Sequence, residues 1–200
     1  MGPGLPFAHL NLRWNPFGEP TPEERAGLAI VTLPELRSGD VVQIVGESGH
    51  GKTTHLLALR ASHRHAVYEK VEEGEDRWRS RLPSAGPFLL DEAQRLRPRL
   101  RRRLFATAET LALGTHEDLS TLTERPVHTV HLSRLTTVAR LQAIVERRIE
   151  WARRGSGPVP VVPEDALLAL ASTYGSDVRA IEWRLYEIFQ HLKEPGHVQV

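Results

Sequence analysis

The chain of 200 residues has no cysteine, a single methionine and only 6% aromatic residues. The absence of cysteine excludes a disulfide framework, a thiolate zinc site and a cysteine nucleophile. No apolar run approaches the about 20 residues that a membrane-spanning helix needs, and the first residues carry no basic flank leading into an apolar stretch. With 40% hydrophobic residues and a formal net charge of +1, the composition predicts a soluble, cytoplasmic protein with one core domain and at most a small appendage.

Lysine is also scarce, because 23 of the 26 basic residues are arginines. One of the three lysines lies in the segment Gly46-Glu47-Ser48-Gly49-His50-Gly51-Lys52-Thr53, which matches the pattern G-x-x-x-x-G-K-[ST] in full. Glycines let the backbone N–H groups of such a loop turn toward phosphate oxygens, and the following helix adds its positive N-terminal end. The segment, with the adjoining Thr54, is therefore the predicted nucleotide-binding loop. Lys52 is expected to reach the β- and γ-phosphates, and the Thr53 hydroxyl to bind Mg²⁺.

A pair of carboxylates provides the second chemical signal. The apolar run Phe88-Leu89-Leu90 ends in Asp91 and Glu92, 39 and 40 residues after Lys52. A residue at the carboxyl end of a parallel strand faces the ligand crevice of the sheet. Asp91 is therefore predicted to contact Mg²⁺ through water, since Mg²⁺ keeps several waters and takes few protein carboxylates. Glu92 is predicted to polarise the water that attacks the γ-phosphate.

Alternating apolar runs and helical segments predict an α/β fold with a parallel, doubly wound sheet. The expected strands are 41–45, 66–68, 87–90, 111–114 and 127–132, with helices over 53–60 and from the arginine-rich stretch to about 109. Thr21 begins a further helix, with Pro22 at its first position, whereas residues 28–31 fit either a helix or a short strand. The fourth strand ends in Thr115 and His116, and Thr115 is the preferred contact for the γ-phosphate or the attacking water.

From Ser133 onward the sequence is wholly helical in pattern. Apolar residues at helical spacing define a first helix from Val138 to Ala152 and a second that ends near Tyr174, and Ser176 is a candidate cap for a third. The predicted organisation is thus an N-terminal arm and lead-in over 1–39, a P-loop core over 40–132 and a three-helix lid over 133–200.

Together, the phosphate loop, the acid-ended strand, the polar-ended strand and the helical C-terminus resemble the AAA+ ATPases over nearly the whole chain. The resemblance implies a molecular switch that binds and hydrolyses ATP with Mg²⁺ and assembles with itself or with a partner complex. It identifies Thr115 with the family's sensor 1. The segment Gly175-Ser176-Asp177-Val178-Arg179 is similar to sensor 2, which implies that Arg179 contacts the γ-phosphate.

Two further positions follow from the resemblance. Arg125, just before the fifth expected strand, fits the place of the family's arginine finger, which acts on the nucleotide of a neighbouring subunit. The segment Asn15-Pro16-Phe17-Gly18 resembles the lead-in of bacterial AAA+ ATPases that serve transposition and secretion, where it lies near the adenine. The process that ATP turnover drives is open, with DNA transactions and defence among the candidates.

A run of arginines directly follows the acidic pair: Arg95, Arg97, Arg99, Arg101, Arg102 and Arg103. Such a strip can contact nucleic-acid phosphates, pair with an acidic partner or neighbouring subunit, or form a solvated face, and the sequence leaves these three open. The ten histidines have no accompanying carboxylate or cysteine cluster that predicts a metal site. A small-molecule P-loop kinase and a non-hydrolysing ATP-binding scaffold are the alternatives to the ATPase.

Overall fold

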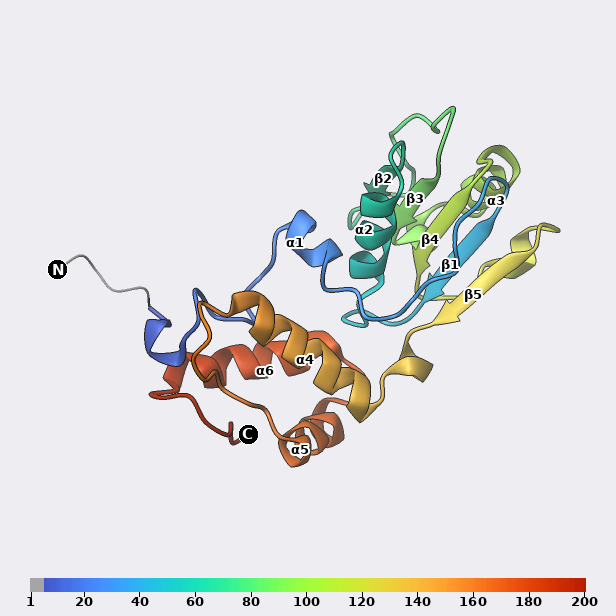
Figure 1. Ribbon diagram of the computed structural model, residues 1–200. Coiled ribbons are helices and arrows are strands. Elements are labelled where there is room, and N and C mark those ends of the chain that lie inside the picture. The colour runs from blue at the N-terminus through green and yellow to red at the C-terminus, as the bar shows by residue number, and fades with distance from the viewer. Residues whose placement is uncertain (1–5) are drawn as a thin grey trace. The chain divides into compact units, whose positions relative to one another are not determined.

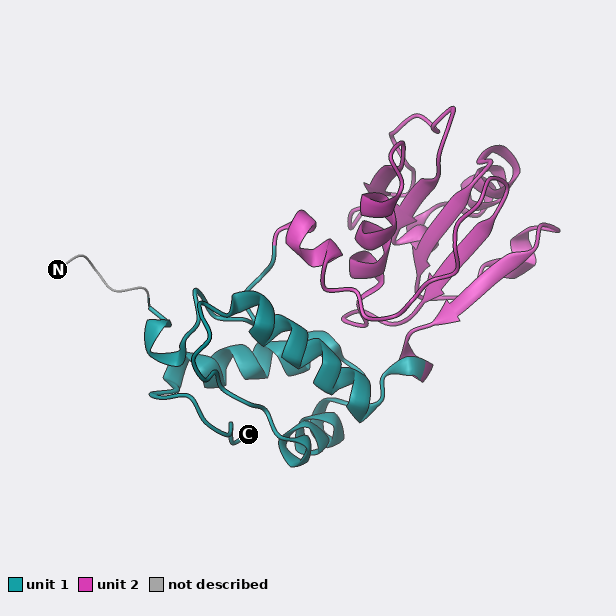
Figure 2. Cartoon of the chain, viewed as in Figure 1, with its two compact units in different colours: residues 1–20, 135–200 teal, residues 21–134 magenta. Residues whose placement is uncertain are grey.

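The structure is a computed structural model in which residues 6–200 are described (Figure 1). Residues 1–5 of the predicted arm, including Pro3 and Gly4, lie outside the described residues. The chain forms two compact units (Figure 2). The sheet unit comprises residues 21–134, and the helical unit comprises residues 1–20 with 135–200. The N-terminal segment therefore groups with the C-terminal helices.

The sheet unit contains five parallel strands in the order β2-β3-β4-β1-β5. The strands are β1 (Val41–Val45), β2 (Val67–Lys70), β3 (Phe88–Asp91), β4 (Leu111–Thr115) and β5 (Val127–His131). All residues of β1, β3 and β4 are buried, as expected for continuous apolar runs in a sheet covered on both faces. The predicted α/β class with a parallel sheet is confirmed.

Helices cover the two faces of this sheet. They are α2 (Lys52–Ser62) and α3 (Pro98–Thr107), with 3₁₀ turns at Ala93–Arg95 and Ser120–Leu122. The short helix α1 (Pro22–Ala26) has no buried residue and lies against α2. Leu56 and Leu59 of α2 belong to one hydrophobic cluster, whereas Leu104 and Phe105 of α3 belong to another. Thr21 caps α1 through a capping box with Glu24, while residues 28–31 form neither a helix nor a strand.

The helical unit contains the three predicted C-terminal helices. They are α4 (Val138–Ala152), α5 (Glu164–Tyr174) and α6 (Val178–His191), with 3₁₀ turns at Ala8–Leu10 and, at the junction of the units, Ser133–Leu135. The prediction that Ser176 caps the third helix is wrong, because the Asp177 side chain accepts the hydrogen bond from the Ala180 N–H. A carboxylate is a stronger acceptor for this exposed N–H and also favours the positive end of the helix.

The Asn15-Pro16-Phe17-Gly18 segment is built into the helical unit. The Asn15 side-chain amide donates to the Tyr186 carbonyl at 2.9 Å, and the Phe17 ring packs edge-on against Phe189 with ring centroids 5.0 Å apart. The buried Arg148 of α4 pairs with Glu182 of α6 at 3.1 Å and lies over the Phe17 ring. These contacts fix the segment to α4 and α6.

Among residues 6–200, no helix is long and apolar enough to cross a membrane.

Candidate nucleotide-binding site

The phosphate loop connects β1 to α2 at the carboxyl edge of the sheet. Gly49 and Gly51 have φ angles of 85° and 86°, in the left-handed region that glycine adopts without steric cost. The Gly46 N–H donates to the Thr115 carbonyl at 3.1 Å, so the start of the loop is fixed to the end of β4. A Cβ atom on Gly46 would lie 3.2 Å from the His50 side chain, so a larger residue at this turn requires His50 to shift.

Two histidines support the loop from within. The Glu47 N–H donates to His50 Nδ1 at 3.1 Å, which closes the loop across three residues. His55, on the first turns of α2, accepts from the Val31 N–H at Nε2 and contacts the Gly51 carbonyl at 2.8 Å through Nδ1. Since Nε2 accepts a hydrogen bond, Nδ1 carries the proton and donates it. The loop is thereby connected to the residues that precede the sheet.

Lys52 is the first residue of α2, and it is buried. Its ammonium group donates to the carbonyls of Gly46 at 2.8 Å and Glu47 at 2.9 Å. The positive charge therefore lies inside the loop, next to the N-terminal end of the helix. Both features favour an anion at this position.

Thr53 and Asp91 meet across 38 residues of chain. The Thr53 hydroxyl donates to Asp91 Oδ2 at 2.5 Å, and the Glu92 N–H donates to Asp91 Oδ1 at 3.0 Å. Asp91 is fully buried, so these donors offset part of the cost of removing its charge from water. The close packing depends on Gly114 of β4, because a Cβ atom there would lie 2.5 Å from Asp91 Oδ1.

Tyr68 is a third neighbour of Asp91, and the sequence analysis did not identify it. Its hydroxyl, on the edge strand β2, donates to Asp91 Oδ2 at 3.3 Å. Burial raises the pKa of Tyr68 well above its usual value, and the negative charge of Asp91 raises it further. Tyr68 therefore remains an uncharged donor to the carboxylate. Tyr68 can be recognised as a neighbour of Asp91 only from its place on the strand next to β3, and that place depends on the strand order.

Glu92 has a strained backbone and three polar neighbours. Its φ of 59° and ψ of 39° put a non-glycine residue in the left-handed region, an arrangement that recurs at functional sites. The carboxylate accepts from Gln94 Nε2 at 2.7 Å and lies 3.5 Å from Arg95 Nε and 3.7 Å from His116 Nε2. Glu92 is therefore held at the end of β3 by a short polar network.

The two candidates at the end of β4 differ in their contacts. The buried Thr115 hydroxyl donates to the Glu117 carbonyl at 2.9 Å and accepts from the Glu117 N–H at 3.3 Å. The His116 ring instead approaches the Glu92 carboxylate, and the His116 main-chain N–H donates to Gln94 Oε1 at 3.3 Å. The preference for Thr115 stays a prediction, while His116 is the residue that lies beside Glu92.

The donor set fits ATP and Mg²⁺. A glycine-rich loop with a buried ammonium and a helix N-terminus suits a chain of phosphates. A hydroxyl and a carboxylate oxygen in contact suit a hard cation that takes oxygen ligands and keeps several waters. Among the described residues, no group of three or more histidines, cysteines or carboxylates is placed so that it could hold a metal ion by itself. A cation at Thr53 and Asp91 would therefore depend on nucleotide and water ligands.

Two predicted residues belong to other elements than those that form this cluster. Arg125 precedes β5, at the amino edge of the parallel sheet, and its guanidinium donates to the main-chain carbonyls of Phe105, Ala108, Gly39 and Glu109. Arg179 lies on α6 in the helical unit, where it is exposed. The arginine-finger and sensor-2 roles both stay predictions.

Comparison of the chain with protein-family models and with curated protein sequences gives no match. The parallel five-stranded sheet with C-terminal helices is consistent with a P-loop-like fold.

Proposed function

We propose that this protein is an ATP-binding and ATP-hydrolysing molecular switch of the AAA+ type, with Mg²⁺ as its metal. The observation that carries the proposal is the 2.5 Å hydrogen bond from the Thr53 hydroxyl to Asp91. It joins the end of a phosphate-loop motif to the carboxylate of a neighbouring strand, at the carboxyl edge where parallel sheets bind ligands. A hydroxyl and a carboxylate at this position have the chemistry to hold Mg²⁺ beside the phosphates.

The loop residues then have distinct roles. The N–H groups of residues 46–54 surround the phosphates, and Lys52 exchanges its two carbonyl partners for phosphate oxygens, which are better acceptors because they are charged. Thr53 binds the metal directly, and Asp91 holds one of its waters. When bound, Mg²⁺ neutralises the charge that develops on the phosphates.

Glu92 is the proposed general base. Its network with Gln94 and His116 supports this role, because it orients the carboxylate at the end of β3. A carboxylate in this position can orient and polarise a water for attack on the γ-phosphate. Arg179 and Arg125 are proposed to act on the γ-phosphate from the lid and from a neighbouring subunit, which makes assembly with another copy or with a partner complex part of the proposal. The cysteine-free composition fits a cytoplasmic setting.

The first test is nucleotide binding and phosphate release by the purified full chain with ATP and Mg²⁺. Lys52→Ala is expected to abolish ATP binding, whereas Lys193→Ala, which removes an exposed lysine of the helical unit, should bind as the unaltered protein does. Equal ATP affinity in Lys52→Ala and the unaltered chain contradicts the proposal. Binding without phosphate release favours the scaffold alternative, and γ-phosphate transfer to an added small molecule favours the kinase.

A further inference from the structure

The run of six arginines after Glu92 separates into two groups of three in the structure. Arg95 donates to the Val71 carbonyl at 2.9 Å, Arg97 pairs with Asp76, and Arg101 pairs with Glu117 at 2.5 Å. These three side chains hold the sheet unit together. The side chains of the other three, Arg99, Arg102 and Arg103, are exposed and make no hydrogen bond or ion pair within the described part of the chain.

The segment that precedes β3, which contacts the start of α3, carries two more exposed arginines. The Arg97 N–H donates to the Asp76 carbonyl at 3.1 Å, which fixes residues 76–77 beside the start of α3. Trp78 and Leu82 pack against the hydrophobic cluster that includes Leu104. Arg77 and Arg81 flank these two anchors, and both are exposed. We call the five together the arginine surface: Arg77, Arg81, Arg99, Arg102 and Arg103.

The carboxylates nearest to this surface are mostly engaged elsewhere. Within residues 72–76, Glu72 pairs with Lys70 at 3.4 Å, and Glu75 and Asp76 pair with Arg79 and Arg97. The arginine surface therefore keeps a concentrated positive charge, although the whole chain carries a formal net charge of only +1. Such a surface attracts a polyanion.

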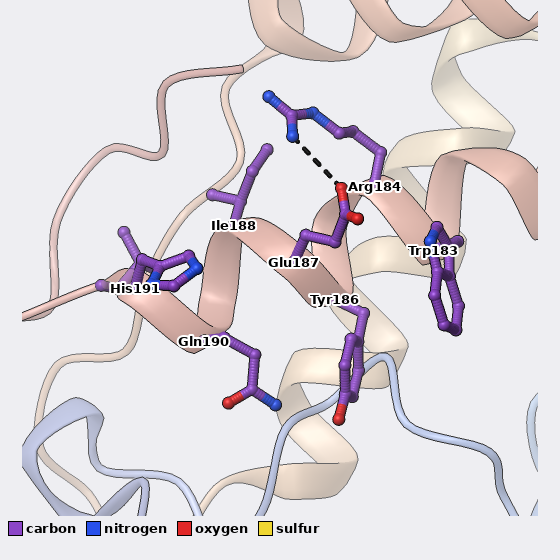
Figure 3. Close-up of a pocket in the computed structure, with 8 residues that line it drawn as sticks. Trp183, Arg184, Tyr186, Glu187, Ile188, Gln190 and His191 are labelled. Atoms are coloured by element: carbon purple, nitrogen blue, oxygen red, sulfur yellow. Dashed lines mark hydrogen bonds and ion pairs between the residues drawn. The ribbon is translucent and has the colours of Figure 1, made fainter.

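The distribution of exposed apolar side chains indicates whether the polyanion is an acidic protein or a nucleic acid. The exposed large hydrophobic residues of the described chain all belong to the helical unit: Trp14, Val161, Leu168, Trp183 and Val200. Figure 3 shows one such place, a groove on α6 where Trp183 stacks on Tyr186. Protein interfaces have an apolar core with aromatic anchors, whereas no large hydrophobic side chain of residues 76–103 is exposed. Protein–DNA interfaces are instead polar and strongly positive.

We propose that the arginine surface binds the phosphate backbone of double-stranded DNA without reading its sequence. Arg99 and Arg103 lie about 6 Å apart along the axis of α3, a length over which a DNA strand presents about two phosphates. Arginine forks match phosphate oxygens in pairs. Single-stranded nucleic acid is a poorer match, because its binding sites offer exposed aromatic rings for base stacking, and Trp78 is only partly exposed. The proposal does not depend on ATP hydrolysis.

The test measures binding of a labelled DNA duplex of arbitrary sequence to the full chain at several KCl concentrations, with and without ATP and Mg²⁺. The slope of log affinity against log salt reports the number of phosphates contacted. The triple variant Arg99→Gln, Arg102→Gln and Arg103→Gln is expected to bind about tenfold or more weakly at low salt. Its slope should fall in magnitude by about one for each arginine removed.

The matched control replaces three exposed arginines that are not part of the arginine surface: Arg60 and Arg64 at the end of α2, and Arg154 after α4. This control removes the same charge, and its slope of log affinity against log salt should differ from that of the unaltered protein by less than about one. A slope that falls equally in both triple variants, or in neither, overturns the proposal. So does an unaltered protein that fails to bind the duplex at low salt in either nucleotide state.

Two further readouts keep the result independent of the proposed ATPase. The urea-unfolding midpoint of the arginine-surface variant should equal that of the unaltered protein, which shows that the sheet unit is folded. Sedimentation of the same variant should show unchanged self-association, and a loss of self-association with DNA binding retained overturns the proposal in favour of a subunit contact. If the protein binds the duplex through these arginines but does not bind ATP, the proposed function is contradicted, whereas the proposed DNA-binding surface is supported.

Discussion

The hydroxyl of Thr53 donates to the carboxylate of Asp91 at 2.5 Å, although 38 residues of chain separate them. The two residues come from the start of α2 and the end of β3, and a fully buried carboxylate receives the bond. The hydroxyl and the carboxylate would hold a divalent cation here, because such a cation takes oxygen ligands and keeps several waters. Thr53, and Gly114 which packs against the Asp91 carboxylate, are therefore the positions to alter first.

Thr53→Val should remove the metal ligand while keeping the shape of the side chain. We expect the Mg²⁺ concentration for half-maximal ATP hydrolysis to rise by about tenfold or more, with ATP binding in EDTA little changed. Thr53→Ser is the matched control, because it retains the hydroxyl and should restore the Mg²⁺ requirement. An Mg²⁺ titration that is the same for valine and serine at position 53 contradicts the assigned role.

Gly114→Ala should disturb the site from the adjacent strand. The new Cβ atom would lie 2.5 Å from Asp91 Oδ1 and 3.0 Å from Leu56 Cδ1, so either the carboxylate or β4 must move. We expect a loss of about 1–3 kcal/mol of unfolding free energy, which is typical of overpacking, together with weaker Mg²⁺-dependent hydrolysis. Urea denaturation measures the first effect. Gly196→Ala, with open space around the added methyl, should be nearly neutral.

Arg125→Ala should destabilise the sheet unit. The guanidinium joins four carbonyls from the segments before β1 and β4, and its removal leaves acceptors without a donor, at a cost of about 2–3 kcal/mol. Thermal unfolding tests this. If Arg125 also acts as an arginine finger, mixing the folded Arg125→Ala protein with Lys52→Ala should recover part of the hydrolysis. If the mixture recovers no hydrolysis under conditions in which the protein assembles, Arg125 has only its structural role.

Asp118→Asn should reveal a pH-dependent contribution to stability. Hydrogen bonds from the Ser120 N–H, then from the Ser120 and Gln43 side chains, lower the pKa of Asp118 below its ordinary value. A carboxyl group with a lowered pKa in the folded state stabilises the fold above its unfolded pKa of about 4, and loses this effect as the pH falls through the folded value. The melting temperature of the asparagine variant should therefore be lower at pH 7, and the difference should shrink below about pH 4. A difference that stays constant with pH contradicts the carboxylate's role.

Much of the sheet was predictable because β1, β3 and β4 are mostly apolar runs that are buried along their whole length. The meeting of Thr53 and Asp91 followed from the same pattern, since the carboxyl ends of parallel strands share one edge. Tyr68 was not predictable, because its contact with Asp91 depends on β2 pairing with β3. The network around Glu92 also depends on a left-handed backbone that no residue type indicates.

The arginines illustrate the same limit. Spacing on a helix places Arg99, Arg102 and Arg103 on one face, but it does not show that Arg95, Arg97 and Arg101 are already paired. Those pairs form with residues 16 to 24 positions away in the chain. Similarly, the position of Arg125 before β5 was clear, but its four carbonyl partners depend on how three chain segments pack together.

The most direct test of the proposed ATPase is a paired measurement on Glu92→Gln. We predict that this variant binds ATP with Mg²⁺ as tightly as the unaltered protein but releases phosphate at least about 100-fold more slowly, because the amide cannot accept the proton of the attacking water. Both quantities are measured on one preparation, by nucleotide titration and by phosphate release. Phosphate release by Glu92→Gln at the rate of the unaltered protein would contradict the account.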